Sequence, residues 1–414
     1  MSSRLPEFYE LSVDERLEII KKFAKLTNDE IGLLKSSTKL GIDVADKMVE
    51  NVIGTTELPF GIAVNFLING KDYLIPMVIE EPSVIAAASH AAKLARNCGG
   101  FQAEADSPIM RGQIQIINPT KNAEDKIMQK KDEILALANS DGSTIIRLGG
   151  GAKGIEMKRI KAKKEMLILY LLVDVRDAMG ANTVNTMLER IAPFVEKITG
   201  GKANFRIISN LADLRLARAK AEWSKKDIGK DVIEGIINGY ELAVADPYRA
   251  ATHNKGIMNG IDAVALATGQ DWRALEAGAH AWAARKGYGP LTRYYKNKNG
   301  NLVGEIELPI AVGIVGGSIK SNPIAQIALK ILGVSSAQDL AAVMAAVGLA
   351  QNFAAMRALA AEGIQKGHMR LHARNIAMAA GIKGRLVDVI ADRMADEGNI
   401  SIARAKELIK EYGN

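Results

Sequence analysis

One polar segment of this 414-residue chain combines charged and amide side chains in a way that suits carbonyl chemistry. It runs from Asp246 to Gly260 and contains Arg249, Lys255 and Asn259. A guanidinium such as that of Arg249 can fork onto a carboxylate, and an ammonium such as that of Lys255 can stabilise a carbonyl oxygen as charge develops on it. The alternative is a surface loop between two apolar helices, and the residues alone leave both interpretations open.

Two further segments carry acids or a hydroxyl group just before expected helices. Glu81 and Ser83 precede one alanine-rich helix, and Asp271 precedes another. Acids are ordinary partners of a helix N-terminus, so capping is the simpler interpretation for each of them taken alone. If Glu80 and Glu81 were buried side by side, one of them would stay protonated and could act as a proton donor.

Two glycine-rich segments differ in the element that each of them opens. Residues 149–154 match the G-x-G-x-x-G pattern but lead into a strand, whereas a Rossmann fingerprint must open a helix, so we expect a turn between strands there. Residues 177–182 come after an apolar strand and open a helix, whose free amide groups suit an anion. A capped helix start explains residues 177–182 equally well.

Two of the five histidines, His368 and His372, share a helical face. No carboxylate lies within their segment, so a single acid–base histidine or a surface pair is a better interpretation than a metal site. The single cysteine, Cys98, excludes an intramolecular disulfide framework and a cysteine-based zinc cluster, and it fits a reducing cytosol. We therefore expect no metal.

Composition indicates a folded protein of two or three domains. Apolar residues make up 48% and charged residues 24%, close to the globular average. The net charge of +7 admits nucleic acid, but aromatic residues are only 5% and the basic run 153–164 contains none. A solvated face or an anionic small ligand explains that run better.

The chain also lacks the expected marks of a membrane protein. Its charge-free stretch, residues 340–356, is short and rich in alanine, and its first residues carry no apolar signal-peptide run. We expect a cytoplasmic protein that binds neither nucleic acid nor membrane.

The periodicity of apolar residues predicts the elements that position these segments. Helices are expected within residues 13–34, and two strands at 58–79 should be joined by an Asn69-Gly70 turn. Residues 108–212 then have the order strand, helix, strand, strand, helix, strand, which is typical of a ferredoxin-like domain. Its strands are expected at residues 112–118, 143–148, 165–175 and 203–209, and its helices at 122–139 and 179–198.

The predicted fold class is α+β. A large helix-rich α/β domain carries the inserted ferredoxin-like domain and ends in a small helical flap. The proposed boundaries are 1–107 and 213–364 for the two parts of the large domain, 108–212 for the insert and 365–414 for the flap.

Together these segments resemble 3-hydroxy-3-methylglutaryl-coenzyme A (HMG-CoA) reductases of class II, the soluble bacterial and archaeal type. Each match is weak alone, but seven occur in the same order over almost the whole chain. They are residues 50–54, 76–83, 177–182, 246–260, 269–273, 313–317 and 367–369.

The resemblance implies a four-electron interconversion of (S)-HMG-CoA and (R)-mevalonate plus CoA through mevaldyl-CoA and mevaldehyde, with two NAD(P)H used in succession. It implies that Glu81 donates a proton to the carbonyl oxygen and that Lys255 stabilises the oxyanion. Asp271 would tune both groups, and His368 on the flap would protonate the departing CoA thiolate. Ser83, Arg249 and Asn259 would bind the carboxylate and hydroxyl groups of HMG.

The resemblance also makes the 177–182 segment a dinucleotide site on the insert. The residues expected to contact the cofactor there are Asp177, Met179, Gly180, Ala181 and Asn182. Asp141 would pair with a ribose 2′-hydroxyl group and Arg147 with a 2′-phosphate; we favour NADH over NADPH because the resembling type mostly uses NADH.

At the level of assembly, the resemblance implies a homodimer, further assembled into a hexamer, with active sites at the dimer interface. The direction, mevalonate synthesis for isoprenoids or mevalonate breakdown, stays open. The alternative function is a non-enzymatic CoA or nucleotide sensor on the same fold.

Overall fold

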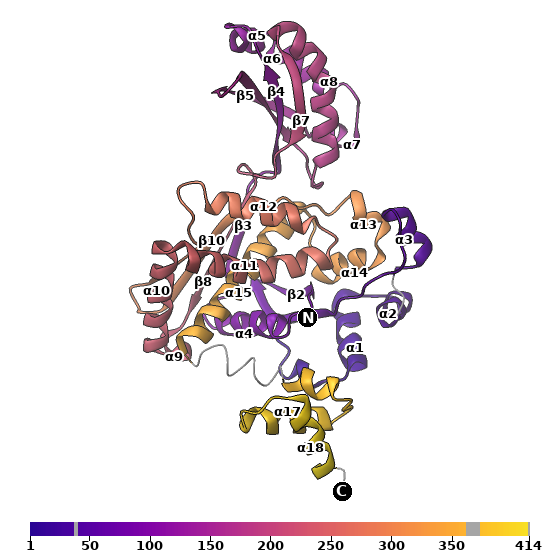
Figure 1. Ribbon diagram of the computed structural model, residues 1–414, viewed down its shortest axis with the longest axis vertical. Coiled ribbons are helices and arrows are strands. Elements are labelled where there is room, and N and C mark those ends of the chain that lie inside the picture. Colours follow the sequence, from indigo (N-terminus) through magenta and orange to yellow (C-terminus); the bar gives the residue numbers. More distant parts are fainter. Residues whose placement is uncertain (37–39, 362–372, 413–414) are drawn as a thin grey trace.

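The main body of the protein is built around a six-stranded sheet of order β2-β1-β3-β8-β10-β9 (Figure 1). The computed structural model describes residues 1–36, 40–361 and 373–412, so His368 and His372 lie outside the described residues. β1 and β3 pair in parallel, and the other neighbours are antiparallel. The strands are β1 (Phe60–Ile68), β2 (Lys71–Val78), β3 (Phe101–Ala105), β8 (Leu216–Trp223), β9 (Thr292–Lys296) and β10 (Leu302–Pro309).

The hairpin of β1 and β2 has the turn predicted from the sequence. Asn69 and Gly70 have φ angles of 51° and 77°, the left-handed conformation that a two-residue type I′ turn requires at both positions. β2 then leads directly to the Glu80–Ser83 segment and to helix α4 (Val84–Arg96).

The central helix α15 (Ala337–Ala361) is apolar and long enough to cross a membrane, but 83% of its most apolar window is buried inside the protein. It packs against α4, α11 (Pro247–Ala267) and the sheet strands β3 and β8. Small residues permit the close contact with α11, since a Cβ at Gly260 would lie 3.0 Å from Cβ of Gln351. The alanine-rich composition of α15 is thus explained by packing in the core.

The remaining helices of the body surround this core. The N-terminal ones are η1 (Phe8–Glu10), α1 (Val13–Ala24), α2 (Asn28–Lys35) and α3 (Ile42–Met48). Two of these, α1 and α2, begin with capping boxes formed by Ser12 with Glu15 and by Thr27 with Glu30. The other surrounding helices are α9 (Lys225–Ile228), α10 (Lys230–Ala245), α12 (Trp272–Ala283), α13 (Gly317–Ser321) and α14 (Pro323–Leu332).

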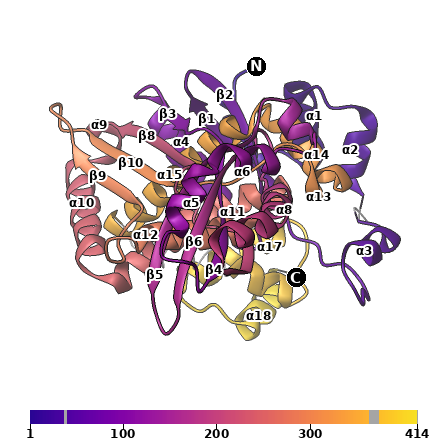
Figure 2. The same cartoon turned by 90° about the horizontal axis from the view of Figure 1, so that it is seen from above.

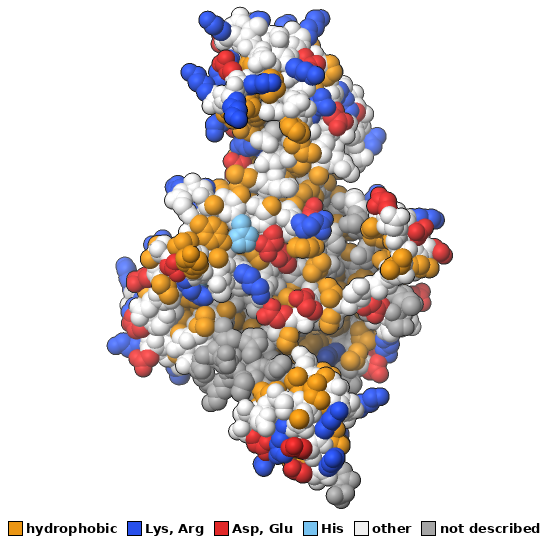
Figure 3. Space-filling model, in the orientation of Figure 1, with side chains coloured by type: hydrophobic (Ala, Val, Ile, Leu, Met, Phe, Trp, Pro, Cys, Tyr) orange, Lys and Arg blue, Asp and Glu red, His pale blue; other side chains and the backbone are white. Residues whose placement is uncertain are grey.

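The insert forms a second sheet of order β5-β6-β4-β7 with a hydrophobic core of its own. This is the strand order of a ferredoxin-like domain, as predicted. The insert lies above α12 in Figure 1 and in front of it in Figure 2, and Lys and Arg side chains are frequent on its surface (Figure 3). Its elements are β4 (Ile109–Ile117), α5 (Ala123–Gln129), α6 (Lys131–Ala138), α7 (Thr144–Arg147), β5 (Gly151–Lys161), β6 (Glu165–Asp174), α8 (Ala181–Thr199) and β7 (Lys202–Ile208).

One strand prediction in the insert is wrong. Residues 143–148 form the short helix α7 and its flanks, and the second strand of the insert is β5. The glycine-rich turn was expected between two strands. A strand does come after it, but the element before it is the helix α7. The reason lies in the basic run, where Ile155 and Met157 alternate with outward-facing charged residues and pack on the core of the insert.

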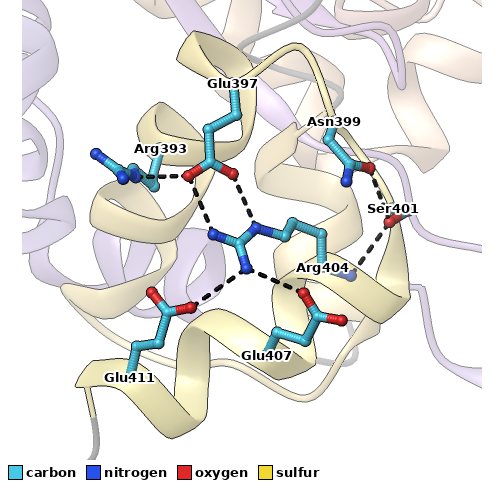
Figure 4. A network of polar contacts seen from close by, with 7 residues as sticks. All are labelled: Arg393, Glu397, Asn399, Ser401, Arg404, Glu407 and Glu411. Carbon is cyan, nitrogen blue, oxygen red and sulfur yellow. Dashed lines mark hydrogen bonds and ion pairs between the residues drawn. The ribbon is translucent and has the colours of Figure 1, made fainter.

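The C-terminal unit has a separate small core and contains α17 (Leu386–Asp396) and α18 (Ile402–Tyr412). A charged network joins the two helices (Figure 4). Arg404 donates to Glu397 at 2.8 Å and to Glu407 at 2.9 Å, and Arg393 donates to Glu397 at 2.7 Å. The network fixes α18 against the end of α17.

Candidate active site

Helix α11 brings a lysine and an amide against the acid that comes after β2. Lys255 Nζ lies 3.2 Å from Glu81 Oε2, and Asn259 Nδ2 lies 3.5 Å from the same oxygen. Lys255 and Asn259 are four residues apart, so they lie on one face of α11. This cluster joins three side chains that the sequence places in two segments far apart in the chain.

The 246–260 segment is helical and not a surface loop. Asp246 caps α11 by accepting from the amides of Tyr248 and Arg249, and Pro247 occupies the first helical position, where its missing N–H costs nothing. The helix therefore sets the spacing of the site, and the loop interpretation is wrong. The exposed fraction of the Lys255 side chain is 62%, so its ammonium is open to a ligand.

Arg249 is half-buried near the start of α11. Its Nη2 contacts Met356 Sδ at 3.2 Å, and burial lowers the pKa of its guanidinium. Within residues 1–36, 40–361 and 373–412, no carboxylate forms an ion pair with its side chain. A half-buried guanidinium in this setting is suited to a carboxylate ligand.

Ser83 has a φ angle of 75°, a left-handed conformation that is uncommon for a residue with a side chain. It lines a cavity of about 1240 Å³ between the N-terminal helices and α4. Much of the cavity is apolar; Arg4, Arg16 and Lys93 add basic groups, and Glu7 and Glu57 add acidic ones. The hydroxyl group of Ser83 thus lies beside a space large enough for an extended ligand with anionic groups.

Asp271 caps α12, as the simpler interpretation predicted. Its Oδ1 accepts from the amide of Ala274 at 3.1 Å and pairs with Arg273 at 3.4 Å. Among the described residues, it makes no hydrogen bond to Lys255 or Glu81. The structure therefore places Asp271 at a helix start and does not join it to the Glu81–Lys255 pair.

The 177–182 turn lies against the main body. Gly180 has a φ angle of 101° and precedes α8, and Asp177 accepts through Oδ1 from the amide of Ala337 at 2.8 Å. The carbonyl oxygen of Asp177 accepts from the amide of Ile314 at 2.9 Å. Met179, Ala181 and Asn182 belong to the same turn and helix start. Residues 313–317, one of the seven matching segments, therefore support this turn.

Asp141 lies in the loop before α7 and is already engaged. It accepts from the amide of Ser143 and from Arg190, both at 2.9 Å. The backbone amide of Ser143 and then Arg190 lower the pKa of this carboxyl group.

A buried polar cluster behind Lys255 had no predicted role. His253 is buried and bonds Thr292, whose hydroxyl group reaches Asn352 at 3.2 Å. Burial, and to a lesser extent Arg249, lowers the pKa of His253 to about 3, so the ring is neutral at physiological pH. The one sequence signal for this buried cluster is the position of His253 on the inward face of an amphipathic helix.

Two more residues, Arg215 and Gln270, were also missed. Each bonds backbone groups of segments distant in the sequence, and single-sequence patterns carry no signal for such contacts. For metals, no group of three or more His, Cys, Asp or Glu side chains that could hold an ion occurs in the described part of the chain.

Comparisons with known proteins agree with the seven segments. The family model described as hydroxymethylglutaryl-coenzyme A reductase matches residues 12–373. The 3-hydroxy-3-methylglutaryl-coenzyme A reductase of Archaeoglobus fulgidus is 57% identical, over 99% of this chain and 95% of that protein. A probable reductase of the same name from Borreliella burgdorferi is 36% identical, over 94% of this chain and 90% of that protein.

Solved structures give the same result. The reductase from Streptococcus pneumoniae superposes with a TM-score of 0.84 at 40% identity, covering 98% of this chain and 99% of that one. A second structure, described as the class II enzyme of that organism bound to NADPH in open conformations, has a TM-score of 0.82 at 41% identity, covering 98% and 100%. The chain therefore belongs to the class II hydroxymethylglutaryl-coenzyme A reductase family of NAD(P)-dependent oxidoreductases.

Proposed function

We propose that this chain interconverts (S)-HMG-CoA and (R)-mevalonate plus CoA, and that Glu81 and Lys255 act on the oxygen of the reacting carbonyl. The observation that carries the proposal is the 3.2 Å contact between Lys255 Nζ and Glu81 Oε2. A carbonyl oxygen bound beside this pair would meet a cation that stabilises its developing charge and a carboxyl group that delivers its proton. The nicotinamide cofactor supplies one hydride in each of the two reductions.

Asp271 is proposed to tune this pair. Both of its described contacts use Oδ1, so Oδ2 is the oxygen available to a reacting group. Because Asp271 is fixed at the start of α12, a change in its charge would alter the titration of Glu81 and Lys255 without a large movement of the backbone.

Substrate binding is proposed to use Arg249, Ser83 and Asn259. Arg249 would bind the HMG carboxylate, and the hydroxyl of Ser83 and the amide of Asn259 would bind the remaining oxygens. The cavity beside Ser83 would take CoA, since its apolar wall suits the pantetheine chain and its basic groups suit phosphates.

His368 is proposed to protonate the CoA thiolate. A thiolate leaves poorly without a proton, and imidazole titrates near neutral pH. The corresponding division of the chain, with the large domain at 1–107 and 213–364, the insert at 108–212 and the flap at 365–414, is supported by the separate cores of the insert and the C-terminal unit.

The dinucleotide is proposed to bind residues 177–182, with NADH favoured over NADPH. The amides at the start of α8 suit its pyrophosphate, and the carboxylate of Asp141 would pair with a ribose hydroxyl group and repel a 2′-phosphate. Arg190 holds that carboxylate in place at 2.9 Å.

We further propose a cytoplasmic homodimer, assembled into a hexamer, with active sites at the dimer interface. Exposed apolar side chains within residues 42–58 support such an interface; Ile53 is fully exposed and lies in a matching segment. The other exposed large apolar residues of this stretch are Ile42, Val44, Met48, Val49 and Leu58.

The test is spectrophotometric. Purified protein is mixed with HMG-CoA and either NADH or NADPH, and the loss of nicotinamide absorbance is monitored. The proposal expects substrate-dependent oxidation, faster with NADH. Absence of turnover in both directions, with folded protein, would contradict it and favour the sensor alternative.

A further inference from the structure

A buried arginine lies where the chain returns from the insert to the six-stranded sheet. Arg215 directly precedes β8 and is 4% exposed. Its Nη1 donates to the carbonyl oxygens of Ala178 at 3.3 Å and Met179 at 3.2 Å, and its Nη2 donates to the carbonyl oxygen of Val312. One guanidinium thus joins the 177–182 turn to the segment of the main body that comes after β10.

The contacts of Arg215 are unusual for a buried charge. Within residues 1–36, 40–361 and 373–412, no carboxylate forms an ion pair with it. Burial lowers the pKa of its guanidinium to about 10, against the opposing effect of Asp177 and Asp174, so it remains charged at neutral pH. A buried cation is unfavourable unless its hydrogen bonds are satisfied, and here backbone carbonyls satisfy them.

The turn and the main body also meet without space between them. A Cβ added at Gly313 would lie 2.6 Å from the amide nitrogen of Met179 and 2.9 Å from the carbonyl oxygen of Asp177. Only glycine allows this approach, because any side chain would push the two segments apart.

Gln270 continues the contact towards the proposed active site. Its Nε2 donates to the carbonyl oxygen of Gly313 at 2.8 Å, and its Oε1 accepts from the amide of Gly313 at 2.9 Å. The next residue, Asp271, caps α12. The 177–182 turn is therefore connected to the segment of Asp271 through Gly313 and Gln270.

We propose that Arg215 and Gln270 are positioning residues that hold the dinucleotide-binding turn at a fixed place on the main body, with Gly313 as the contact surface. The inference rests on the proposed cofactor role of residues 177–182. If the turn is held this way, loosening it should weaken binding of the dinucleotide and leave binding of HMG-CoA nearly unchanged, because Arg215 and Gln270 touch none of the proposed HMG ligands.

The first test uses full-length Arg215→Met, which keeps an unbranched apolar side chain but removes the donors. We expect the Kd for NADH, measured by fluorescence without HMG-CoA, and the KM for NADH to rise roughly tenfold, the effect of losing one charged hydrogen bond. The KM for HMG-CoA should stay within about twofold of the parental value. General destabilisation would not raise the KM for NADH alone. Arg215→Lys should restore part of the NADH affinity.

Two controls sharpen this result. Arg159→Met removes ion pairs with Glu124 and Glu165 in the insert, away from the turn, and should leave the KM for NADH unchanged. Gly313→Ala tests the same contact without altering charge and should also raise the KM for NADH. Its matched control is Gly154→Ala, where the nearest atom to the new Cβ would be 3.5 Å away.

The outcomes distinguish failure of the positioning role of Arg215 and Gln270 from failure of the proposed cofactor role of residues 177–182. If Asn182→Ala does not weaken NADH binding, the cofactor role of the turn fails and the inference fails with it. If Asn182→Ala weakens NADH binding while Arg215→Met and Gly313→Ala do not, only the positioning role is overturned. If Arg215→Met does not fold, Gly313→Ala and Gln270→Leu decide the question. Each should raise the KM for NADH and leave the KM for HMG-CoA nearly unchanged.

Discussion

Lys255 Nζ lies 3.2 Å from Glu81 Oε2, although 174 positions separate the two residues in the chain. Helix α11 supplies the ammonium, and the segment between β2 and α4 supplies the carboxyl group. Asn259 reaches the same carboxyl oxygen from one turn further along α11. This arrangement places a cation and a carboxyl group where one substrate oxygen could contact both.

Glu81→Gln should lower kcat by about 10²-fold or more, because the amide cannot deliver the proton that a general acid supplies. The KM for HMG-CoA should change little, since glutamine keeps the size and polarity of the side chain. Steady-state kinetics measure both quantities. Glu80→Gln, at the exposed neighbouring acid, is the matched control and should retain activity; equal losses in the two variants would remove the specific role of Glu81.

His368→Gln should slow reduction of the HMG thioester by about 10²-fold and leave reduction of free mevaldehyde nearly unchanged. Only the thioester route expels a thiolate, so only that route needs the imidazole proton. Both rates are measured with the same cofactor. His372→Gln serves as the control, and a similar loss on both substrates in His368→Gln would point to closure of the flap instead of proton transfer.

Asp141→Ala should raise the KM for NADH roughly tenfold, the effect of losing one charged hydrogen bond, and change the KM for NADPH less. The ratio of kcat/KM for the two cofactors gives the result. Arg190→Met, which removes the 2.9 Å partner of Asp141, should shift the ratio in the same direction to a smaller extent. If Asp141→Ala leaves the ratio of kcat/KM for NADH and NADPH unchanged, another residue binds the ribose hydroxyl group.

Asp262 should make folding stability decrease as pH rises. Burial, and then Glu276, raises the pKa of this carboxyl group from 3.8 to about 8. The folded state therefore keeps a proton that the unfolded state has lost, so stability is lost progressively between these two values. Asp262→Asn should abolish this dependence, and the difference in urea midpoint between the variant and the parent protein, measured across pH, isolates it. A constant difference would contradict the assignment.

Short-range patterns predicted much of the fold. Asn69-Gly70 indicated the first hairpin, and alternating apolar residues with one clear helix on each side of the β5–β6 pair indicated the ferredoxin-like order of the insert. The prediction failed at residues 143–148, where the isoleucines favoured a strand but the segment contains helix α7, and the strand is β5. Periodicity cannot distinguish so short an apolar run from a helical turn.

The site was only partly predictable for a different reason. The residue types and their ordered segments identified Glu81, Lys255 and Asn259, and the structure brings these together. The roles of Arg215 and Gln270 depend on backbone atoms of the 177–179 and 312–313 segments. Such contacts join segments that are far apart in the chain, so no local pattern encodes them.

The most direct test of the account is Lys255→Met, assayed for reduction of both HMG-CoA and free mevaldehyde. Both rates should fall by about 10²-fold or more, since both reductions build charge on the same oxygen. Thermal stability should be nearly unchanged because the side chain is 62% exposed, and Lys226→Met, at an exposed lysine of α9, should keep both rates. Retention of either reduction at the parental rate in folded Lys255→Met would contradict the proposed role of the Lys255–Glu81 pair.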